Sequence, residues 1–574
     1  MSNINSWKDI RWAPIEERVF RLQLRIYKAA TNGELEKLYK LQKLLISSKS
    51  AKYLSVRKVT QQNSGKKTPG VDNIIIKTPR EKFFLAERLT LDGKSSDIRR
   101  TYIEYPDGKR RPLGIPTIED RAKQMLAYLA LCPQWEASFE ASSYGFRPGR
   151  SVHDAMEAIF LGISKKSKWV LDANISKCFD QINHQYLLEK CKTFPKMQKQ
   201  IRAWLKAGIL DGDDYAFPEM GTPQGGIISP LLANIALHGI REHLNTYINS
   251  LGGHRPNNRQ AFTYVRYADD FVFMHPEKKV IEDSIPVVQQ FLEPIGLELH
   301  PVKTRLIHTF DSYEGKPPGF TFLGFDIVQK VKRVKQREVY TKRPSNQKFI
   351  TLITPSNEGV KRHKLKLKEI IRRSRGISQE KLIQKLNPII RGWALSKRTQ
   401  ISSKTFQALD QYVFMHLWKW SRKRHPKMSK YKLKDKYWHK VGSRNWVFGM
   451  KCNDVVSLQL QMHSKITIKR FAKVKGTASP FDGNLIYWAK RSGKSPIIPD
   501  IKARLIKEQN GRCGICNKLF LPDDIIERDH IVPKALGGKN IRSNVHVVDN
   551  YCHMEKTNSE RLKIRCNRKL VKPS

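Results

Sequence analysis

Apolar positions recur with two different periods along the chain, and the changes of period divide it into segments. In the first 50 residues they recur every three or four positions, as in the run IEERVFRLQLRIYKAATNGELEKLYKLQKLLI. This spacing predicts amphipathic helices. Residues 51–165 mix basic loops with short apolar runs.

Between residues 166 and 330, strand-like runs alternate with helical stretches, which predicts an α+β layer. The strand-like runs are KWVLDANI, TYVRYADDFVFM and GFTFLGFDI, and SIPVVQQFLEPIG is one of the helical stretches. Residues 357–424 have an all-helical and very basic pattern. Residues 425–500 are basic and aromatic with weak periodicity, and a compact module is predicted to begin near residue 501.

The run TYVRYADDFVFM, residues 263–274, is predicted to be a mostly buried strand, yet two adjacent acids lie in its middle. Burying two charges without partners is unfavourable. Divalent ions would compensate Asp269 and Asp270, and Mg²⁺ held by carboxylates activates hydroxyl groups and stabilises leaving oxyanions in phosphoryl transfer. Such chemistry calls for a further carboxylate from a neighbouring strand. A solvated turn is the alternative interpretation of the acid pair.

The charge balance favours a polyanionic partner. Lys and Arg total 106 against 53 acidic residues, a formal net charge of +53 in 574 residues. Such a chain would repel itself unless a polyanion neutralised it, and nucleic acid fits this requirement. No membrane association is expected, because no apolar run approaches the ~18 residues of a span and MSNINSWKDIRW lacks the apolar core of a signal peptide. Eight cysteines in so long a chain predict a reducing compartment.

Short motifs in a fixed order carry a resemblance to a known family. They are TPGVD (68–72), GKRRPLGIPTIEDRAKQ (108–124), SSYGFRPGRSVHDA (142–155), KCFDQINH (177–184), GTPQGGIISPLLANI (221–235), YADD (267–270), VKT (302–304), FLGF (322–325) and LNPIIRGWA (386–394). With them the chain resembles the group II intron-encoded proteins, which combine a reverse transcriptase, a maturase region and often a nuclease. The resemblance covers nearly the whole chain.

The resemblance implies a multidomain α+β fold. The expected units are an N-terminal helical extension (1–50), right-hand reverse transcriptase fingers and palm (51–350), an α-helical thumb and maturase domain (351–450), a basic DNA-binding linker region (451–500) and a small zinc-stabilised ββα-metal HNH endonuclease (501–574).

The resemblance also assigns roles in the palm. Asp269 and Asp270 are expected to be its Mg²⁺ ligands. Gln224 in the loop GTPQGG is expected to lie against the nascent base pair, and Phe179 under the incoming sugar, where its bulk disfavours a 2′-hydroxyl. Lys303 matches a positive group near the triphosphate or primer, and a solvated surface charge is the alternative for it.

One departure from the family concerns the first catalytic acid, which relatives place five residues before the bulky aromatic. Here that position is Asn174, whose amide offers an oxygen but no negative charge to two closely spaced divalent ions. Asp172 lies on the same face of the strand but ~6.6 Å away, too far to take the same coordination position without a backbone shift.

A second departure lies in the fingers. The family's lysine, expected six residues before Arg111, is replaced by Tyr105, with Glu104 beside it. Arg111 itself matches a positive group near the triphosphate or primer, with a solvated surface charge as the alternative. Lys109 or Arg110 are the substitute cations nearby. The two departures together predict weak or absent DNA synthesis, which restoring the palm acid would raise.

The basic helical stretch shares the motifs LNPIIRGWA and LWKWSRKRHPKMSKYKLKDKYW with the family's thumb and maturase region, which binds the parent intron RNA and helps it to fold for splicing. Lys and Arg neutralise phosphates, and aromatic faces would stack on exposed bases. The aromatic residues expected in this role are Trp393, Trp418, Trp420, Tyr437 and Trp438. Ordinary helix packing is the alternative for them.

The C-terminal module resembles an HNH nuclease through CGIC, ERDHIVPKALGGKNIRSN and CHMEKTN. Cys513 and Cys516, separated by two residues, form a common zinc half-site, with Cys552 as the third expected ligand of a structural Zn²⁺. The fourth ligand stays open among three candidates, which are Asp549, His546 and Cys566.

The same resemblance assigns a cleavage site. His530 is the expected general base, oriented by Asn544, and imidazole suits this role because it titrates near neutral pH. Asp529 and His553 are expected to hold one divalent ion, Mg²⁺, at the scissile phosphate. Asn558 stands where some relatives have a closing His. An inactive, zinc-stabilised DNA-binding knuckle is the alternative.

Three functions are consistent with these patterns. The favoured one is a maturase and mobility protein that binds group II intron RNA, cleaves target DNA and supports target-primed reverse transcription. The others are a splicing-only RNA-binding maturase with decayed enzymatic sites and a plain nuclease on a nonspecific basic scaffold. The expected location is a ribonucleoprotein, cytoplasmic or nucleoid-associated in a bacterium, or organellar if an organelle encodes it. The oligomeric state stays open, with a dimer as one option.

Overall fold

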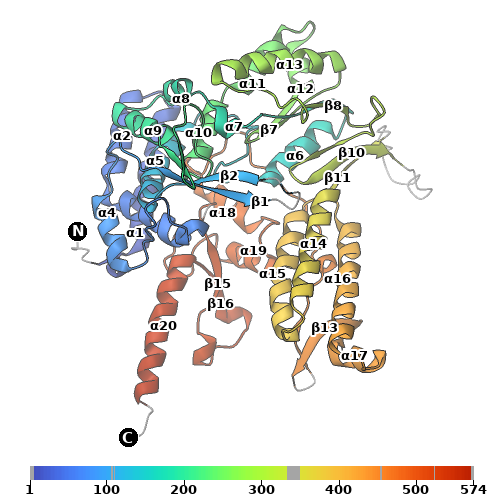
Figure 1. The fold of residues 1–574 in the computed structure, drawn as a ribbon. Helices are drawn as coiled ribbons and strands as arrows, with labels where there is room; N and C mark the ends of the chain where they lie inside the picture. The colour runs from blue at the N-terminus through green and yellow to red at the C-terminus, as the bar shows by residue number, and fades with distance from the viewer. Residues whose placement is uncertain are drawn as a thin grey trace.

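Figure 1 shows the chain as a computed structural model, which describes residues 6–570 except 105–107, 109, 333–348, 453–454 and 523. Side chains are described for all of these residues but Cys452 and 562–570. The sequence predictions for Tyr105, Lys109 and the Cys566 thiol therefore fall outside the described residues.

The N-terminal residues form a layer of helices, blue in Figure 1. Helices α1 (Trp12–Thr31) and α2 (Leu35–Ser47) confirm the predicted periodicity, because buried residues such as Val19, Ile26 and Leu45 recur at helical spacing. Both helices pack on α5. The layer also contains η1 (Trp7–Asp9), α3 (Lys49–Arg57), the π-helical turn η2 (Lys58–Gln62), η3 (Ser64–Lys67), α4 (Pro79–Arg88) and α5 (Ile118–Glu136).

A four-stranded antiparallel sheet with the order β6-β7-β3-β8 lies at the centre of the fold. Its strands are β3 (Trp169–Asn174), β6 (Thr263–Tyr267), β7 (Asp270–His275) and β8 (Arg305–His308). Leu171 and Phe271 join the large hydrophobic core that includes the N-terminal helices, whereas Val170 and Val272 join a second core. Alternate side chains of a strand point to opposite faces, so both faces of this sheet are buried.

The prediction of one continuous strand through TYVRYADDFVFM is wrong. The segment is a hairpin in which β6 ends at Tyr267 and β7 begins at Asp270. Ala268 has a left-handed φ of 58°, which suits the first position of a two-residue hairpin turn. The turn packs against the end of β3, where the Ile175 N–H donates to the Asp269 carbonyl oxygen at 3.2 Å. The two acids are therefore half-buried rather than splayed into solvent.

A second four-stranded sheet has the order β2-β1-β4-β5. Its strands are β1 (Ile98–Glu104), β2 (Arg110–Ile115), β4 (Ile209–Asp211) and β5 (Asp214–Ala216). The Gly114 N–H of β2 donates to the Gln224 carbonyl oxygen at 2.6 Å, which joins this sheet to the loop GTPQGG. The helices around the two sheets are α6 (Val152–Ile163), α7 (Cys178–Gln181), α8 (His184–Lys190), α9 (Pro195–Leu205), α10 (Ser229–Ala236), α11 (Ile240–Ser250), α12 (Arg255–Ala261), α13 (Lys278–Leu292) and η4 (Glu293–Ile295).

A helical lobe, yellow and orange in Figure 1, follows a three-stranded sheet with the order β11-β10-β9. That sheet consists of β9 (Phe320–Phe322), β10 (Phe325–Val331) and β11 (Phe349–Pro355). The all-helical prediction for residues 357–424 is confirmed by α14 (Asn357–Arg373), α15 (Gln379–Lys397) and α16 (Ser403–Arg424). The region of weak periodicity begins with α17 (Lys430–Tyr437), β12 (Trp438–Val441), β13 (Arg444–Cys452), β14 (Val455–Gln459) and η6 (His463–Lys465).

The second half of the expected linker region packs back on the sheet layer. Val474 and Trp488 belong to the second core, and the Val474 N–H donates to Asp154 Oδ1 of α6 at 2.7 Å. The chain ends with α18 (Leu485–Gly493), α19 (Asp500–Glu508), β15 (Ile526–His530), η7 (Lys534–Leu536), η8 (Arg542–Asn544), β16 (Val545–Asp549) and α20 (Asn550–Leu570). None of the helices described is long and apolar enough to cross a membrane.

Candidate functional site

The first candidate site, the carboxylate site, lies where β3 meets the β6–β7 hairpin. The antiparallel register pairs Asn174 with Asp270, and Asn174 Nδ2 donates to Asp270 Oδ1 at 2.5 Å. Burial and repulsion by Asp270 raise the pKa of Asp172 to about 7, and burial and the charge of Asp269 raise the pKa of Asp270. Because burial and mutual repulsion disfavour these charged forms, the residues present fit a divalent cation.

A buried network holds the acid-bearing turn in place. Arg266 is fully buried and donates to Asn234 Oδ1 at 3.1 Å and to the Ala268 carbonyl oxygen at 3.4 Å. Glu140 supplies the opposite charge, 3.7 Å from Arg266. A side chain at Gly145 would approach the Ala268 nitrogen to 2.4 Å, so only glycine permits this packing. The lone Arg in an apolar strand was the sequence signal for this network.

Three of the predicted substrate contacts lie together beside the carboxylate site. Arg111 Nε donates to Gln224 Oε1 at 3.1 Å, and Gln224 Nε2 donates to both carboxylate oxygens of Asp180, at 3.0 and 3.1 Å. Phe179 and Asp180 lie on α7 and line one pocket with Gln224. Burial and the nearby Asp269 raise the pKa of Cys178, the first residue of α7. Asp180 was not predicted, and its only sequence signal is its place beside Phe179.

The cations predicted around this site have different environments. Lys303 is exposed. Its positive charge acts to lower the pKa of Asp270, against the effect of burial, so Lys303 lies near the acids. Arg110 lies 3.6 Å from Glu104 across the β1–β2 pair. Arg110, one of the two substitute cations, is thus paired with Glu104, the acid next to the position where the family's lysine is expected.

The second candidate site begins with a cluster of thiols. The sulfur atoms of Cys513, Cys516 and Cys552 all lie within 4.8 Å of one another. Hydrogen bonds from the Cys516 and Cys552 thiols lower the pKa of Cys513. Convergent thiols, one of them easily ionised, fit a structural zinc ion.

The described candidates for the fourth zinc ligand have other partners. Asp549 lies 3.8 Å from Lys518 Nζ, and His546 Nε2 lies 3.1 Å from Asp529 Oδ2. Among the side chains that the structure describes, no further His, Cys or acidic residue joins the three thiols. Cys566 lies on α20 together with Cys552, but ~21 Å further along the helix axis, which is too far for both residues to hold one zinc ion.

His530, the predicted general base, ends β15 with its Nε2 atom 3.1 Å from Asn540 Oδ1. The Asn544 side chain bonds elsewhere: it accepts from the Val532 N–H at 2.8 Å and donates to the carbonyl oxygens of Val532 and Lys539 at 3.0 and 2.9 Å. Asn544 therefore shapes the loop between β15 and β16, whereas Asn540 contacts the imidazole. Asn540 was not predicted, although the motif GGKN contains it.

The two predicted ion ligands of this site, Asp529 and His553, lie close together, but a lysine pairs with Asp529. His553 Nε2 is 3.6 Å from Asp529 Oδ1, and Lys556 Nζ is 2.7 Å from Asp529 Oδ2. Burial acts to raise the pKa of Asp529, but hydrogen bonds from Lys556 and His546 bring it below its ordinary value. Glu527 adds a further carboxylate, 2.5 Å from His553 Nδ1. This donor set fits a divalent ion, with Lys556 as a competing cation.

A buried ion network fixes the C-terminal module to the N-terminal helices. Lys518 Nζ lies 2.6 Å from Glu16 Oε2, and Glu16 also pairs with Arg57, which is 1% exposed. The Arg57 guanidinium lies 4.3 Å from the Trp12 ring centroid and 3.4 Å from that of Tyr551. The C-terminal module therefore packs directly on the N-terminal helices, which share the large hydrophobic core with the central sheet.

Most of the aromatic residues expected to stack on bases are in the core of the helical lobe. Trp393 and Trp418 are half-buried. The other three are at most 4% exposed and confirm the packing alternative, namely Trp420, Tyr437 and Trp438. Trp446, which is 49% exposed, was not predicted because β13 lies in the region of weak periodicity.

Comparison with protein families identifies the parts of the chain. The N-terminal domain of reverse transcriptase matches residues 7–89, and the reverse transcriptase (RNA-dependent DNA polymerase) family matches residues 103–327. The group II intron, maturase-specific domain matches residues 360–438, and the HNH endonuclease family matches residues 513–568. The chain is therefore a reverse transcriptase-type protein with a maturase domain and a nuclease domain.

Individual relatives point to the same family. The chain is 30% identical to protein YkfC of Escherichia coli (strain K12) over 362 residues, which cover 56% of this chain and 92% of that protein. It is 43% identical over 146 residues to the group II intron-encoded protein LtrA of Lactococcus lactis subsp. cremoris, covering 25% of this chain and 24% of LtrA. It is 27% identical over 338 residues to maturase-like protein 1 of Euglena gracilis, covering 57% of this chain and 67% of that protein. The chain belongs to the family of group II intron-encoded proteins.

Proposed function

We propose that this protein binds group II intron RNA, assists its splicing as a maturase, and supports intron mobility through HNH cleavage of target DNA and weak target-primed reverse transcription. The maturase-specific match and the net charge of +53 support RNA binding. The proposal of a weak polymerase rests on the amide of Asn174, which contacts Asp270 at the position where the resemblance to the family implies an acid.

Each part of the chain is assigned its own role. Residues 51–350 act as right-hand fingers and palm behind the helical extension of residues 1–50. The remaining units are the thumb and maturase domain (351–450), the basic DNA-binding region (451–500) and the HNH endonuclease (501–574).

At the carboxylate site, Asp269 and Asp270 are the proposed Mg²⁺ ligands. Bound Mg²⁺ supplies activation of the primer hydroxyl and stabilisation of the leaving oxyanion. Asn174 contributes an oxygen without charge, so the remaining carboxylates compensate two divalent ions less well.

Substrate positioning falls to the cluster next to these acids. Gln224, held between Arg111 and Asp180, is proposed to pack against the nascent base pair. Phe179 is proposed to lie under the incoming sugar, and Lys303, near the acids, to approach the triphosphate or primer.

In the nuclease domain, His530 is proposed to take the proton of the attacking water while Asn540 orients its ring. Asp529 and His553 are the proposed ligands of one Mg²⁺ ion, which would stabilise the charge at the scissile phosphate. Structural Zn²⁺ would be held by three thiols, those of Cys513, Cys516 and Cys552.

A second candidate function is a splicing-only maturase with decayed enzymatic sites. Two contacts favour it: the amide of Asn174 on Asp270, and the ammonium group of Lys556 on Asp529. Each places a group other than a metal ligand against a carboxylate that the chemistry needs.

Three assays on one preparation of the full chain test these functions. They measure splicing of the group II intron RNA that surrounds the reading frame, nicking of DNA that carries the intron's insertion site, and primer extension on an RNA template with Mg²⁺. Stimulated splicing with nicking and weak extension is the expected result. Splicing alone would favour the second function, and full primer extension by the unmodified protein would contradict the role given to Asn174. Failure to promote splicing would overturn both.

A further inference from the structure

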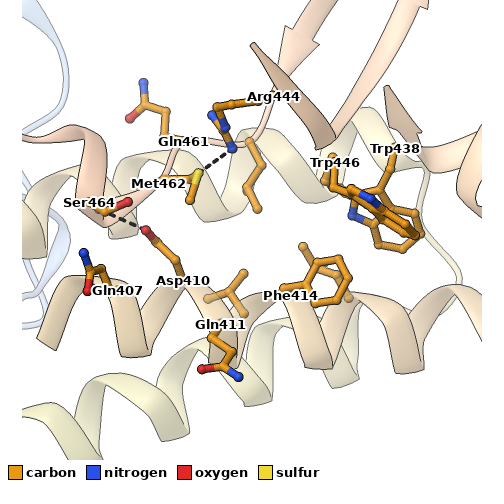
Figure 2. Close-up of a pocket in the computed structure, with 14 residues that line it drawn as sticks. Gln407, Asp410, Gln411, Phe414, Trp438, Arg444, Trp446, Gln461, Met462 and Ser464 are labelled. Atoms are coloured by element: carbon orange, nitrogen blue, oxygen red, sulfur yellow. Dashed lines mark hydrogen bonds between the residues drawn. The ribbon is translucent and has the colours of Figure 1, made fainter. Parts of the chain in front are cut away.

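A pocket of about 370 Å³ lies between α16, β13 and the segment that precedes η6, outside both candidate catalytic sites (Figure 2). Aromatic rings line part of it, among them those of Phe414, Trp438 and Trp446. Trp438 is 2% exposed, but Phe414 is 37% and Trp446 is 49% exposed. The pocket therefore presents open aromatic faces on a buried aromatic base.

Neighbouring rings hold these faces in fixed orientations. The ring centroids of Phe414 and Trp446 lie 6.0 Å apart at 79°, and Phe414 stacks on Trp418 at 6.3 Å. Trp438 supports Trp446 from the core side, with centroids 6.5 Å apart. Rings ordered before binding lose little conformational entropy when a flat ligand stacks on them.

Side-chain amides at the rim supply hydrogen-bonding groups without charge. Gln407, Gln411 and Gln461 line the pocket, and their amides form no hydrogen bonds within the described part of the chain. By contrast, the carboxylate of Asp410 is occupied, because it accepts from the Ser464 N–H at 3.0 Å. An amide offers both donors and an acceptor, which suits the edge of a nucleobase.

The surroundings of the pocket are cationic. Lys434 Nζ lies 6.0 Å from the Trp446 ring centroid, and Arg444 enters the pocket beside Met462. Helix α16 carries one acid, Asp410, and a set of cations consisting of Lys404, Lys419, Arg422, Lys423 and Arg424. Such a surface attracts a polyanion to the aromatic faces.

We propose that this pocket captures one unpaired base of the intron RNA. Aromatic faces stack on the base, rim amides meet its edge, and flanking cations neutralise the adjoining phosphates. Folded RNA offers such bases in loops and bulges, where they are unstacked and free to enter a protein pocket. The inference rests on the proposed maturase function, and it extends the RNA contact past the matched residues 360–438 to β13 and Gln461.

The test compares Trp446→Ala with Tyr431→Ala, a control that removes an aromatic ring 83% exposed on α17 and outside the pocket lining. The intron transcript is the probe, titrated at several salt concentrations. Trp446→Ala should bind about 5- to 100-fold more weakly, the range for losing one base–aromatic stack. The salt dependence should stay the same because no phosphate contact is lost. Tyr431→Ala should retain the wild-type affinity, Trp446→Phe should recover most of it, and thermal unfolding should show that each variant is folded.

The outcomes separate this inference from the function on which it rests. If the wild type does not prefer the intron transcript to an unrelated structured RNA, the maturase function fails. If the wild type does prefer it and Trp446→Ala binds equally well, only the pocket proposal is overturned. Equal losses of affinity in Trp446→Ala and Tyr431→Ala would also overturn the pocket proposal. So would a result in which Trp446→Ala loses affinity only for single-stranded DNA of the same sequence and not for the transcript.

Discussion

The two candidate catalytic sites balance their carboxylates in opposite ways. At the carboxylate site, Asp270 receives a hydrogen bond from a neutral amide, and burial raises its pKa. In the nuclease domain, Asp529 lies 2.7 Å from the ammonium group of Lys556, and its pKa is lowered. A divalent ion would thus meet too little negative charge at the first site and a resident cation at the second.

The two sites also differ in what holds them together. The carboxylate site belongs to a sheet with hydrophobic cores on both faces. The nuclease domain has a small core of its own, which includes Cys513 and Cys552. Lys518 of this domain forms an ion pair with Glu16 of the N-terminal helices, and Glu16 also pairs with Arg57. Small cores commonly need a metal or a neighbouring surface for stability, so the second site should be far more sensitive to metal removal.

Zinc removal is expected to have the largest effect, because structural zinc contributes about 10–16 kcal/mol to the folding of small zinc modules. A chelator, or Cys513→Ser, should unfold the nuclease domain and leave the central sheet intact. Limited proteolysis followed by mass spectrometry would detect the loss of residues 501–574. Cys191→Ala, which removes a buried thiol from the large core, is the matched control. An unchanged digestion pattern with chelator would contradict a structural zinc site.

His530→Ala should lower the rate of DNA nicking by about 10²–10⁴-fold, the range for losing a general base. Asn540→Ala should have a smaller effect on the rate, because it removes only a contact to the imidazole. Asn544→Ala should act mainly on stability, since its side chain bonds to the loop backbone. Rates measured with supercoiled plasmid that carries the insertion site would rank the three variants. Equal nicking by His530→Ala and the wild type would remove His530 from the mechanism.

Asn174→Asp should raise primer extension by about 100-fold, because it restores a charged ligand where charge develops in the transition state. Single-turnover extension on an RNA template, at varied Mg²⁺ concentration, measures the change. Asp172→Asn is the matched control, because it removes a carboxylate whose charged form burial disfavours. This variant should be more stable than the wild type at pH 8, and its primer extension should stay weak. Loss of all residual extension in that control would instead make Asp172 the substitute ligand.

Lys556→Met is expected to have the smallest effect, and it tests the competing cation directly. A bound ion would no longer have to break a charge-assisted hydrogen bond to Asp529, so nicking should need about tenfold less Mg²⁺. The Mg²⁺ concentration at half-maximal nicking is the quantity to measure, with Lys539→Met of the neighbouring loop as the control. A higher Mg²⁺ requirement in Lys556→Met would show that the lysine supports the site.

Periodicity predicted the helices well because a helix with one buried face imposes its spacing on the sequence. It failed at the hairpin, where strand-like apolar residues flank the two acids on both sides and Ala268, rather than glycine, adopts the left-handed φ. It also failed in β12–β14, where the strand register shifts between His439 and Val441 and again between Met450 and Lys451, so buried and exposed positions do not alternate regularly. For the same reason Trp446 was overlooked while the buried Trp420 and Trp438 were chosen.

The sequence alone determined the family, the polyanionic partner class and the chemistry of the sites, because charge totals, motif order and residue types are properties of the chain itself. Only the tertiary structure decided which groups touch: Asn174 on Asp270, Asn540 rather than Asn544 on His530, and Lys556 on Asp529. These contacts depend on strand register and loop shape, which long-range packing fixes. Spacing along one chain cannot specify how residues far apart in sequence meet.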